Sequence, residues 1–289
     1  MATLNKQIWI RQLMKNFYPD VSFLNYVKNY TALVEYDKFT MAEVGMDPEV
    51  LINNTTYPIT VSERIDEPIE VTLDLFETKN TIIRRPEAIE LAYDKLESVL
   101  YGHKQSLRVS TAKKAAHAFA PDTDALFTPV IACTGEADAN GLKKLTVQDI
   151  LTLKRRYDDL DIPKEDRYLV LDPKHTEDLI NIDLKSFKDI TDFKNGAPQR
   201  FAGFNMLEFS KNPKYDAANL TKSAFDSVTG TAHSSFSFQK NEVMRADGTV
   251  HMYDTKDDPK ERATIVGFDK RFIALPIRNK GVGAIVSGS

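Results

Sequence analysis

The pattern of apolar and polar positions changes twice along the first 120 residues. Residues 1 to about 55 carry a short amphipathic stretch around Trp9, then scattered aromatic rings such as Phe17 and Tyr26 without a regular period. A segment this short cannot bury its own rings, because it has too little interior. We therefore expect an arm that packs on another surface.

From about residue 56 to 77 the pattern alternates with a period of two, most clearly between Ile69 and Leu75. Alternation predicts β-strands that bury one face. Two turns are compatible with a hairpin here, Asp66-Glu67-Pro68 and Thr78-Lys79-Asn80, and each would join a different pair of strands. The sequence leaves both choices open.

A helical period follows. Pro86 suits the first position of a helix, and Pro121 can end one. Between them, apolar or aromatic side chains recur at steps of three and four residues: Ile89, Ala92, Leu96, Val99, His103 and Leu107. At about 1.5 Å per residue, a helix to about Phe119 would be about 50 Å long.

The rest of the chain predicts shorter elements. Thr146 can cap a helix together with Asp149, three residues later. Residues 214–262 show only a mixed α/β pattern. The other expected elements are a strand at 168–171, a helical turn at 176–180, a strand at 203–209, and strands at 272–275 and 282–286.

Composition narrows the function classes. The 289 residues are 42% hydrophobic and 28% charged, which is typical of a folded protein with a real core. The net charge of −4 disfavours a protein whose main role is to coat nucleic acid, since that role needs a basic surplus. No apolar run approaches the roughly 18 residues that a membrane span requires.

Motifs for chemistry are absent from the sequence. The single cysteine, Cys133, forms neither an internal disulfide nor a thiolate zinc site, and the five histidines lack metal-site spacing. There is no phosphate-binding loop, dinucleotide fingerprint or nucleophile elbow. Asp254, Asp257 and Asp258 are the one candidate cation cluster, although the adjacent lysines favour a solvated loop. We expect no catalytic residue, cofactor or metal, and no enzyme.

An aromatic arm, an alternating charged ribbon and a long helix all precede any compact core. Such extended parts are best buried on neighbouring copies in a symmetric assembly.

With these parts in this order, the sequence resembles the Hong Kong 97-like major capsid proteins of tailed bacteriophages. The resemblance rests on four passages: Ile69 to Phe76 leading into Thr81 to Arg85, the helix Pro86 to Ala120, Asp161 to Pro173, and Phe201 to Leu207. It implies an α+β capsid fold. In family terms, 1–55 is the N-terminal arm, 56–85 the extended β-hairpin loop, 86–120 the spine helix of the peripheral domain, and 121–289 the interleaved peripheral and axial domains.

The resemblance also implies a function. Such a chain forms hexamers and pentamers of itself that close into an icosahedral head around double-stranded DNA, which it contacts non-specifically. Portal, scaffold or other head proteins are expected partners, and no membrane is. The location would be the virion capsid, assembled in the cytoplasm of the bacterial host.

Residues of the arm and the loop are the candidates for contacts between subunits: Trp9, Phe17, Tyr26, Arg64, Asp66, Glu67, Arg84 and Arg85. Two other functions remain open. One is the shell of an encapsulin-type compartment with the same fold, and the other is a soluble metal-dependent enzyme that uses the Asp254, Asp257 and Asp258 cluster.

Overall fold

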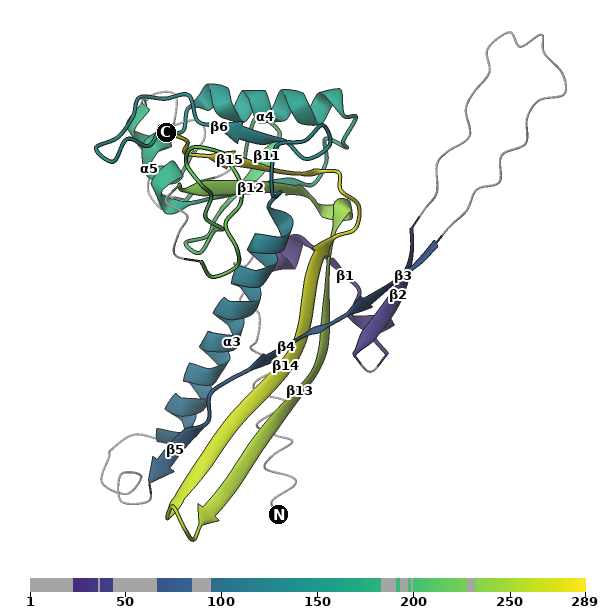
Figure 1. Ribbon diagram of the computed structural model, residues 1–289, viewed down its shortest axis with the longest axis vertical. Coiled ribbons are helices and arrows are strands. Elements are labelled where there is room, and N and C mark those ends of the chain that lie inside the picture. Colours follow the sequence, from purple (N-terminus) through teal and green to yellow (C-terminus); the bar gives the residue numbers. More distant parts are fainter. Residues whose placement is uncertain are drawn as a thin grey trace, which may run out of the picture.

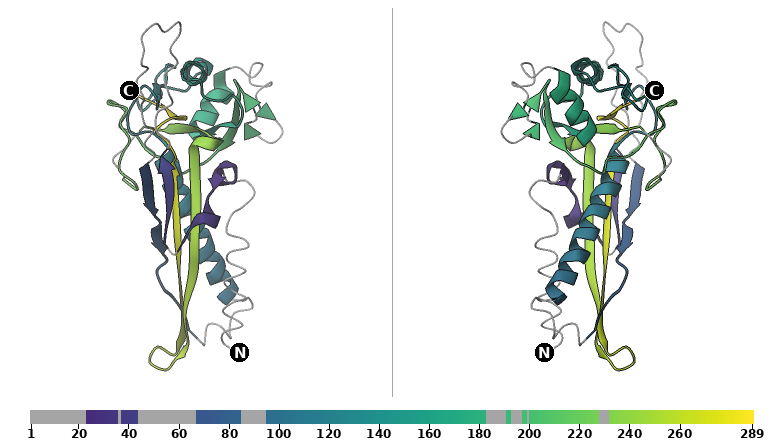
Figure 2. Two further views of the ribbon diagram at one scale, coloured as in Figure 1. Left: turned by 90° about the vertical axis from the view of Figure 1, so that its right-hand side faces the viewer. Right: turned by 90° about the vertical axis from the view of Figure 1, so that its left-hand side faces the viewer.

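The structure is a computed structural model, and it describes residues 23–35, 37–43, 67–84, 95–182, 191–192, 197–198, 200–227 and 232–289. These residues form two parts, a wide head and a long stem below it (Figure 1). Viewed from the side, the stem is a thin layer in which a long helix lies along a long strand ribbon (Figure 2).

The head is built on a six-stranded mixed sheet with the order β10-β11-β7-β12-β15-β6. The pairs β7–β11 and β15–β6 are parallel, and the others are antiparallel. Its strands are β6 (Val130–Ala132), β7 (Arg167–Leu171), β10 (Arg200–Phe201), β11 (Phe204–Glu208), β12 (Ser234–Gln239) and β15 (Val282–Val286). Helices α4 (Val147–Asp159) and α5 (Pro173–Ile182) complete the head.

Helix α4 begins as the sequence predicts. Thr146 Oγ1 accepts the Asp149 N–H bond at 3.3 Å, and the Asp149 carboxylate accepts the Thr146 N–H bond at 2.8 Å. This reciprocal capping box satisfies two of the N–H groups that a helix start leaves unpaired. The helix then buries Ile150, Leu153 and Tyr157 against the sheet.

The stem consists of a helix and a five-stranded sheet in which β13 and β14 form a long antiparallel ribbon. Its elements are α3 (Lys95–Phe119), β1 (Lys28–Asn29), β4 (Asp74–Glu77), β5 (Thr81–Arg84), β13 (Val243–Asp258) and β14 (Ala263–Pro276). The smaller elements of the chain are η1 (Phe23–Tyr26), η2 (Thr31–Leu33), η3 (Lys240–Glu242), β8 (Thr191–Asp192) and β9 (Ala197–Pro198).

Helix α3 is the element along which the stem packs. The apolar positions predicted at 103 and 107 are buried, and the stripe continues with Thr111, Ala115 and Phe119. Leu107 packs in one cluster with Val266 and Phe268 of β14. The predicted stop before Pro121 is confirmed, since α3 ends at Phe119. The predicted start at Pro86 lies outside the described residues.

The hairpin in the loop region differs from both versions that the sequence suggested. Strand β3 (Glu67–Thr72) pairs with β2 (Lys38–Glu43), which lies in the range assigned to the arm. Glu67 and Pro68 are strand residues opposite Glu43 and Ala42, so the proposed turn at 66–68 is wrong. The turn at 78–80 is also wrong as a hairpin, because β4 and β5 both pair with β14.

The described residues of the region read as mixed α/β, 214–262, contain two strands, one short 3-10 helix and no α-helix. Strands β12 and β13 begin at Ser234 and Val243, and β14 extends the predicted strand at 272–275 in both directions. Charged positions inside the ribbon hid this pattern. Lys270 of β14 is 2% exposed, and its ammonium forms an ion pair with Asp247 of β13. Burial lowers the pKa of Lys270 to about 8, although the Asp247 carboxylate opposes that shift.

Candidate assembly interface

The β2–β3 pair projects from the stem as a two-stranded ribbon (Figure 1). Its base is held by Phe39, Val71 and Leu73, which pack on Met244 and Ile273 of the stem sheet. An isolated two-stranded ribbon is only marginally stable in water. The ribbon therefore gains stability wherever it finds a further surface to pack on.

Tyr26 lies where η1 meets the head. Its ring stacks on Tyr168 with centroids 4.8 Å apart, and 37% of the residue stays exposed. The neighbouring Phe23 is buried among Phe119, Phe209 and Phe236. The described part of the arm thus packs on its own subunit, and Tyr26 keeps one accessible side.

Arg84 ends β5 near the far end of the stem ribbon. Its guanidinium lies 3.8 Å from the Glu261 carboxylate and donates to the Glu261 carbonyl at 3.3 Å. Glu67 opens β3 at the outer end of the described ribbon. The other candidates, Trp9, Phe17, Arg64, Asp66 and Arg85, lie outside the described residues, so their contacts remain predictions.

One face of the stem sheet exposes apolar side chains that the sequence analysis did not identify. Tyr253, Ile82 and Leu75 are 58%, 39% and 47% exposed. They stand opposite Gly267, Ile265 and Arg271 in register, so all three lie on the face that points away from α3. The alternation in the sequence marks two faces but does not say which one a helix covers.

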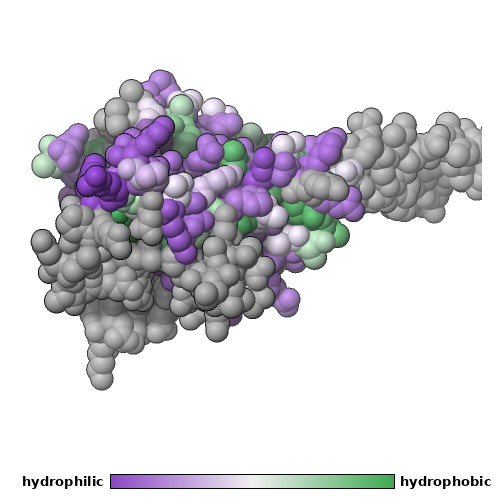
Figure 3. Space-filling view, turned by 90° about the horizontal axis from the view of Figure 1, so that it is seen from below, coloured by the Kyte–Doolittle hydropathy of each residue, from purple (hydrophilic) through white to green (hydrophobic). Residues whose placement is uncertain are grey.

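The surface seen from below is mixed in hydropathy (Figure 3). Hydrophilic residues cover much of the described surface, and hydrophobic residues form separate patches between them (Figure 3). A divided surface of this kind suits several distinct contacts better than one continuous apolar interface.

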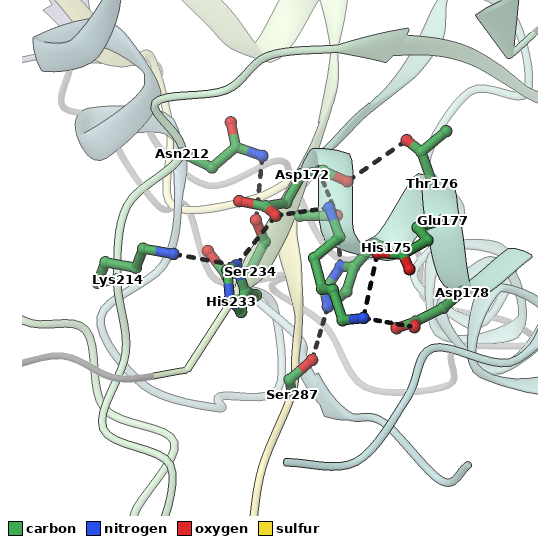
Figure 4. A network of polar contacts seen from close by, with 12 residues as sticks. Asp172, His175, Thr176, Glu177, Asp178, Asn212, Lys214, His233, Ser234 and Ser287 are labelled. Carbon is green, nitrogen blue, oxygen red and sulfur yellow. Dashed lines mark hydrogen bonds and ion pairs between the residues drawn. The ribbon is translucent and has the colours of Figure 1, made fainter. Parts of the chain in front are cut away.

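The head contains a buried polar network at the end of β7 (Figure 4). His175 of α5 is fully buried, with Nδ1 2.7 Å from Ser235 Oγ and Nε2 2.8 Å from Ser287 Oγ. Asp172 accepts the Lys174 N–H bond at 3.0 Å, which caps α5, and lies 3.0 Å from Nδ1 of His233. The network ties α5, β12 and the chain after β15 together.

This network lacks the properties of a catalytic site. Burial lowers the pKa of His175 to about 4, so its imidazole is neutral at pH 7. Cys133 Sγ lies 3.9 Å from His175 Nε2, but burial raises the pKa of the thiol. A protonated thiol beside a neutral imidazole is not an activated nucleophile. The sequence analysis assigned neither residue a role, because the five histidines lack metal-site spacing and a single cysteine forms no thiolate zinc site.

No group of three or more metal-ligating side chains comes together among the described residues. Asp254 and Asp258 belong to one extended strand, which places positions four apart about 13 Å from each other. The strand therefore separates the carboxylates that the metal-enzyme hypothesis needs together.

Within the described part of the chain, no helix combines the length and hydropathy of a membrane span.

Comparisons with known proteins address the fold. No model of a known protein family matches the chain, and no curated protein matches it. Solved structures do. A structure from Mycobacterium phage Che8 superposes with a TM-score of 0.69 at 13% identity, over 93% of each chain. The capsid of Cyanophage P-SCSP1u gives a TM-score of 0.67 at 16% identity, over 91% of this chain and 87% of that one.

A virus-like particle from Pyrococcus furiosus gives a TM-score of 0.58 at 10% identity, over 97% of this chain and 99% of that chain. The predicted α+β capsid fold is confirmed by these structures.

Proposed function

We propose that this chain is a major capsid protein, the structural subunit of a phage head. The observation that supports this function best is the extent of the structural match. Capsid structures from several phages match more than nine-tenths of the chain. The subunit then acts by association, with no catalysis of its own.

In this function, copies form hexamers and pentamers that close an icosahedral shell around double-stranded DNA. Portal and scaffold or other head proteins are the additional partners, and the DNA is contacted without sequence preference. Assembly takes place in the cytoplasm of the bacterial host, and the final location is the virion. The net charge of −4 is compatible with a lining that encloses DNA without gripping it.

The extended parts give this association a physical basis. The β2–β3 ribbon needs a surface to pack on, and the exposed stem face with Leu75, Ile82 and Tyr253 needs a cover. Contact between a ribbon on one copy and a stem on the next satisfies both needs at once. The arm residues Trp9 and Phe17, and the loop residues Arg64, Asp66 and Arg85, belong to the same proposal.

An encapsulin-type compartment is the second candidate, and the likeness to the Pyrococcus furiosus particle favours it. That match has a TM-score of 0.58, against 0.69 for the Che8 structure. The contents of particles isolated from the native source discriminate the two. Packaged DNA supports a phage head, whereas an enclosed enzyme supports a compartment.

Assembly of the purified chain tests the proposal. We expect five- and six-membered rings or closed shells, seen by negative-stain microscopy and sized by light scattering, with a scaffold protein added if the chain alone forms only rings. A strictly monomeric species at high concentration, with a scaffold protein from the same source present, contradicts the proposed function.

A further inference from the structure

A basic cavity of about 290 Å³ opens between α3 and two loops of the head. Lys113 comes from the helix, Lys211 and Lys214 come from the loop before Tyr215, and Phe225 comes from the second loop. The aromatic ring lies under the Lys113 ammonium, 5.6 Å from its centroid. The cavity therefore presents several cations around one apolar wall.

Asn212 lines this cavity and carries an unpaired acceptor. The residue is 6% exposed, and its Nδ2 donates to the carbonyls of Val170 at 3.3 Å and Ser234 at 3.0 Å. Those two bonds fix the orientation of the amide. Oδ1 has no hydrogen-bond partner within the described structure, and it points away from the bonded side in Figure 4. A buried acceptor left in this state is destabilising, because it has lost its hydrogen bonds to water without gaining others.

The cations of the cavity are only partly neutralised. Lys113 pairs with Asp226, and Lys214 Nζ lies 3.1 Å from His233 Nδ1. Lys211 is exposed and makes no ion pair among the described residues. The site therefore matches a group that brings negative charge, and the carboxylates of a protein loop supply it.

The chain itself carries such a loop. Residues 158–166, here the acidic loop, are the last two residues of α4 and the connection to β7, and they expose Asp159, Asp161 and Glu165. Asp158 is held by Lys154 and Arg167, and Asp166 by Lys240, but those three exposed acids form no ion pair within the described part of the chain. Acids at the C-terminal end of a helix oppose its dipole, so cations from another molecule would be favourable here.

The acidic loop and the cavity lie at opposite ends of one strand. The loop ends where β7 begins at Arg167, and Asn212 bonds Val170 near the other end of β7. Five residues of strand separate them by about 17 Å. If one of these surfaces on one copy binds the other surface on the next copy, the contact is heterologous. Repeated from copy to copy, such a contact forms a closed ring when the rotations between copies add up to a full turn.

We propose that the acidic loop of one copy enters the Asn212 cavity of the next copy around a ring. The carboxylates of Asp159, Asp161 and Glu165 meet Lys211 and Lys214 at the cavity. This inference rests on the proposed self-assembly and assigns one of its contacts. The contact joins the heads of neighbouring copies and is separate from the β2–β3 ribbon.

Charge reversal on each side tests this contact. A cavity variant carries Lys211→Glu and Lys214→Glu, and a loop variant carries Asp159→Lys and Glu165→Lys. Lys211→Glu alone serves as a milder cavity variant, because Lys214 lies beside the buried network. The fourth protein carries all four changes and has the net charge of the wild type. Circular dichroism checks the fold of each, and sedimentation measures the assembled fraction at equal concentration.

We expect each one-sided variant to lose about tenfold or more of its assembled fraction, because like charges then face each other. The four-change variant should recover assembly, and so should an equal mixture of cavity and loop variants, whose copies alternate around an even-membered ring. Normal assembly of folded one-sided variants, or no recovery in the four-change variant, overturns the contact while the proposed function stands. A wild-type chain that never associates overturns both.

Discussion

Two buried ionisable side chains in the head are stabilised by opposite means. His175 is held without charge between two serine hydroxyls. Arg167 keeps its charge, with Nη1 2.8 Å from the Asp158 carboxylate and Nε 2.9 Å from the Pro163 carbonyl, and its guanidinium lies over the Tyr157 ring. The stability that depends on His175 changes with pH. The stability that depends on Arg167 is lost when its guanidinium no longer donates hydrogen bonds.

The stability of the protein should depend on pH through His175. Its folded pKa of about 4 lies below the unfolded value of about 6.5, so the unfolded chain binds more protons between these limits. Stability is therefore lost as the pH falls through this window. We expect this residue to remove about 2 kcal/mol of unfolding free energy between pH 7 and pH 5.

Urea titrations of the wild type and of His175→Gln at both pH values measure this contribution. The variant is less stable at pH 7, but its loss on acidification should be smaller by about that amount. His251→Gln, on an exposed strand position, is the matched control and should keep the wild-type pH dependence. Parallel pH profiles for the wild type and His175→Gln would show that the imidazole is not held neutral.

Arg167→Met should destabilise the head. The change preserves much of the volume but leaves the carbonyls of Ile162 and Pro163 without their donor, and the Asp158 carboxylate keeps only Lys154. Unpaired buried acceptors predict a loss of about 2 to 4 kcal/mol in denaturant unfolding. Arg155→Met, on the exposed side of α4, should change stability by no more than about 0.5 kcal/mol. Equal effects would mean that the Arg167 network contributes little.

At the scale of elements, α3 determines how the stem packs. Leu107 is 2% exposed, whereas Val109, two positions further along the same helix, is 43% exposed. Leu107→Ala should cost about 2 to 5 kcal/mol, because it removes buried surface and leaves a cavity against Phe268. Val109→Ala should cost about 0.5 kcal/mol or less. Denaturant titration of monomers compares them, and similar values would contradict the packing of α3 on the ribbon.

Elements with complete local signals could be predicted from the sequence. The reciprocal bonds of Thr146 and Asp149 start α4, and Pro121 follows the end of α3, because caps and prolines act within a few residues. Strand pairing is not local. The partner of β3 lies about 30 residues upstream in β2, and no pattern within β3 identifies it. Nor does a local pattern reveal that Lys270 and Asp247 neutralise each other across two strands.

The candidate site was predictable to a similar extent. The need for neighbours follows from aromatic and alternating segments that exceed the local core. Which residues meet the neighbour does not, because Arg84 and Tyr26 find partners within their own subunit. The exposed face with Leu75 and Tyr253 depends on which side α3 covers, and that choice is made only when the ribbon folds.

At the scale of the whole molecule, the segment that joins β2 to β3 can be replaced without changing either strand. Glu43 and Glu67 face each other in register, so replacing residues 44–66 by Asn-Gly closes the hairpin with a two-residue turn. Phe39, Val71 and Leu73 remain packed on the stem. We expect a folded monomer that does not form shells, because the loop residues proposed to contact the neighbour, Arg64 and Asp66, are gone.

Thermal unfolding and light scattering measure the two outcomes separately. A shortened chain that unfolds would place residues 44–66 in the core of the monomer. Normal shells would show that assembly does not use residues 44–66.

The position of β15 in the head sheet has a consequence for synthesis. β15 is the last strand along the chain, yet it lies between β12 and β6, and in the described sheet β6 is held only through it. Ala284 pairs with Val130, 154 positions earlier. At about 5 to 20 residues per second, a ribosome takes about 8 to 30 seconds to cover that interval. Throughout it the head cannot close, so a nascent subunit has no finished head to offer to a growing shell.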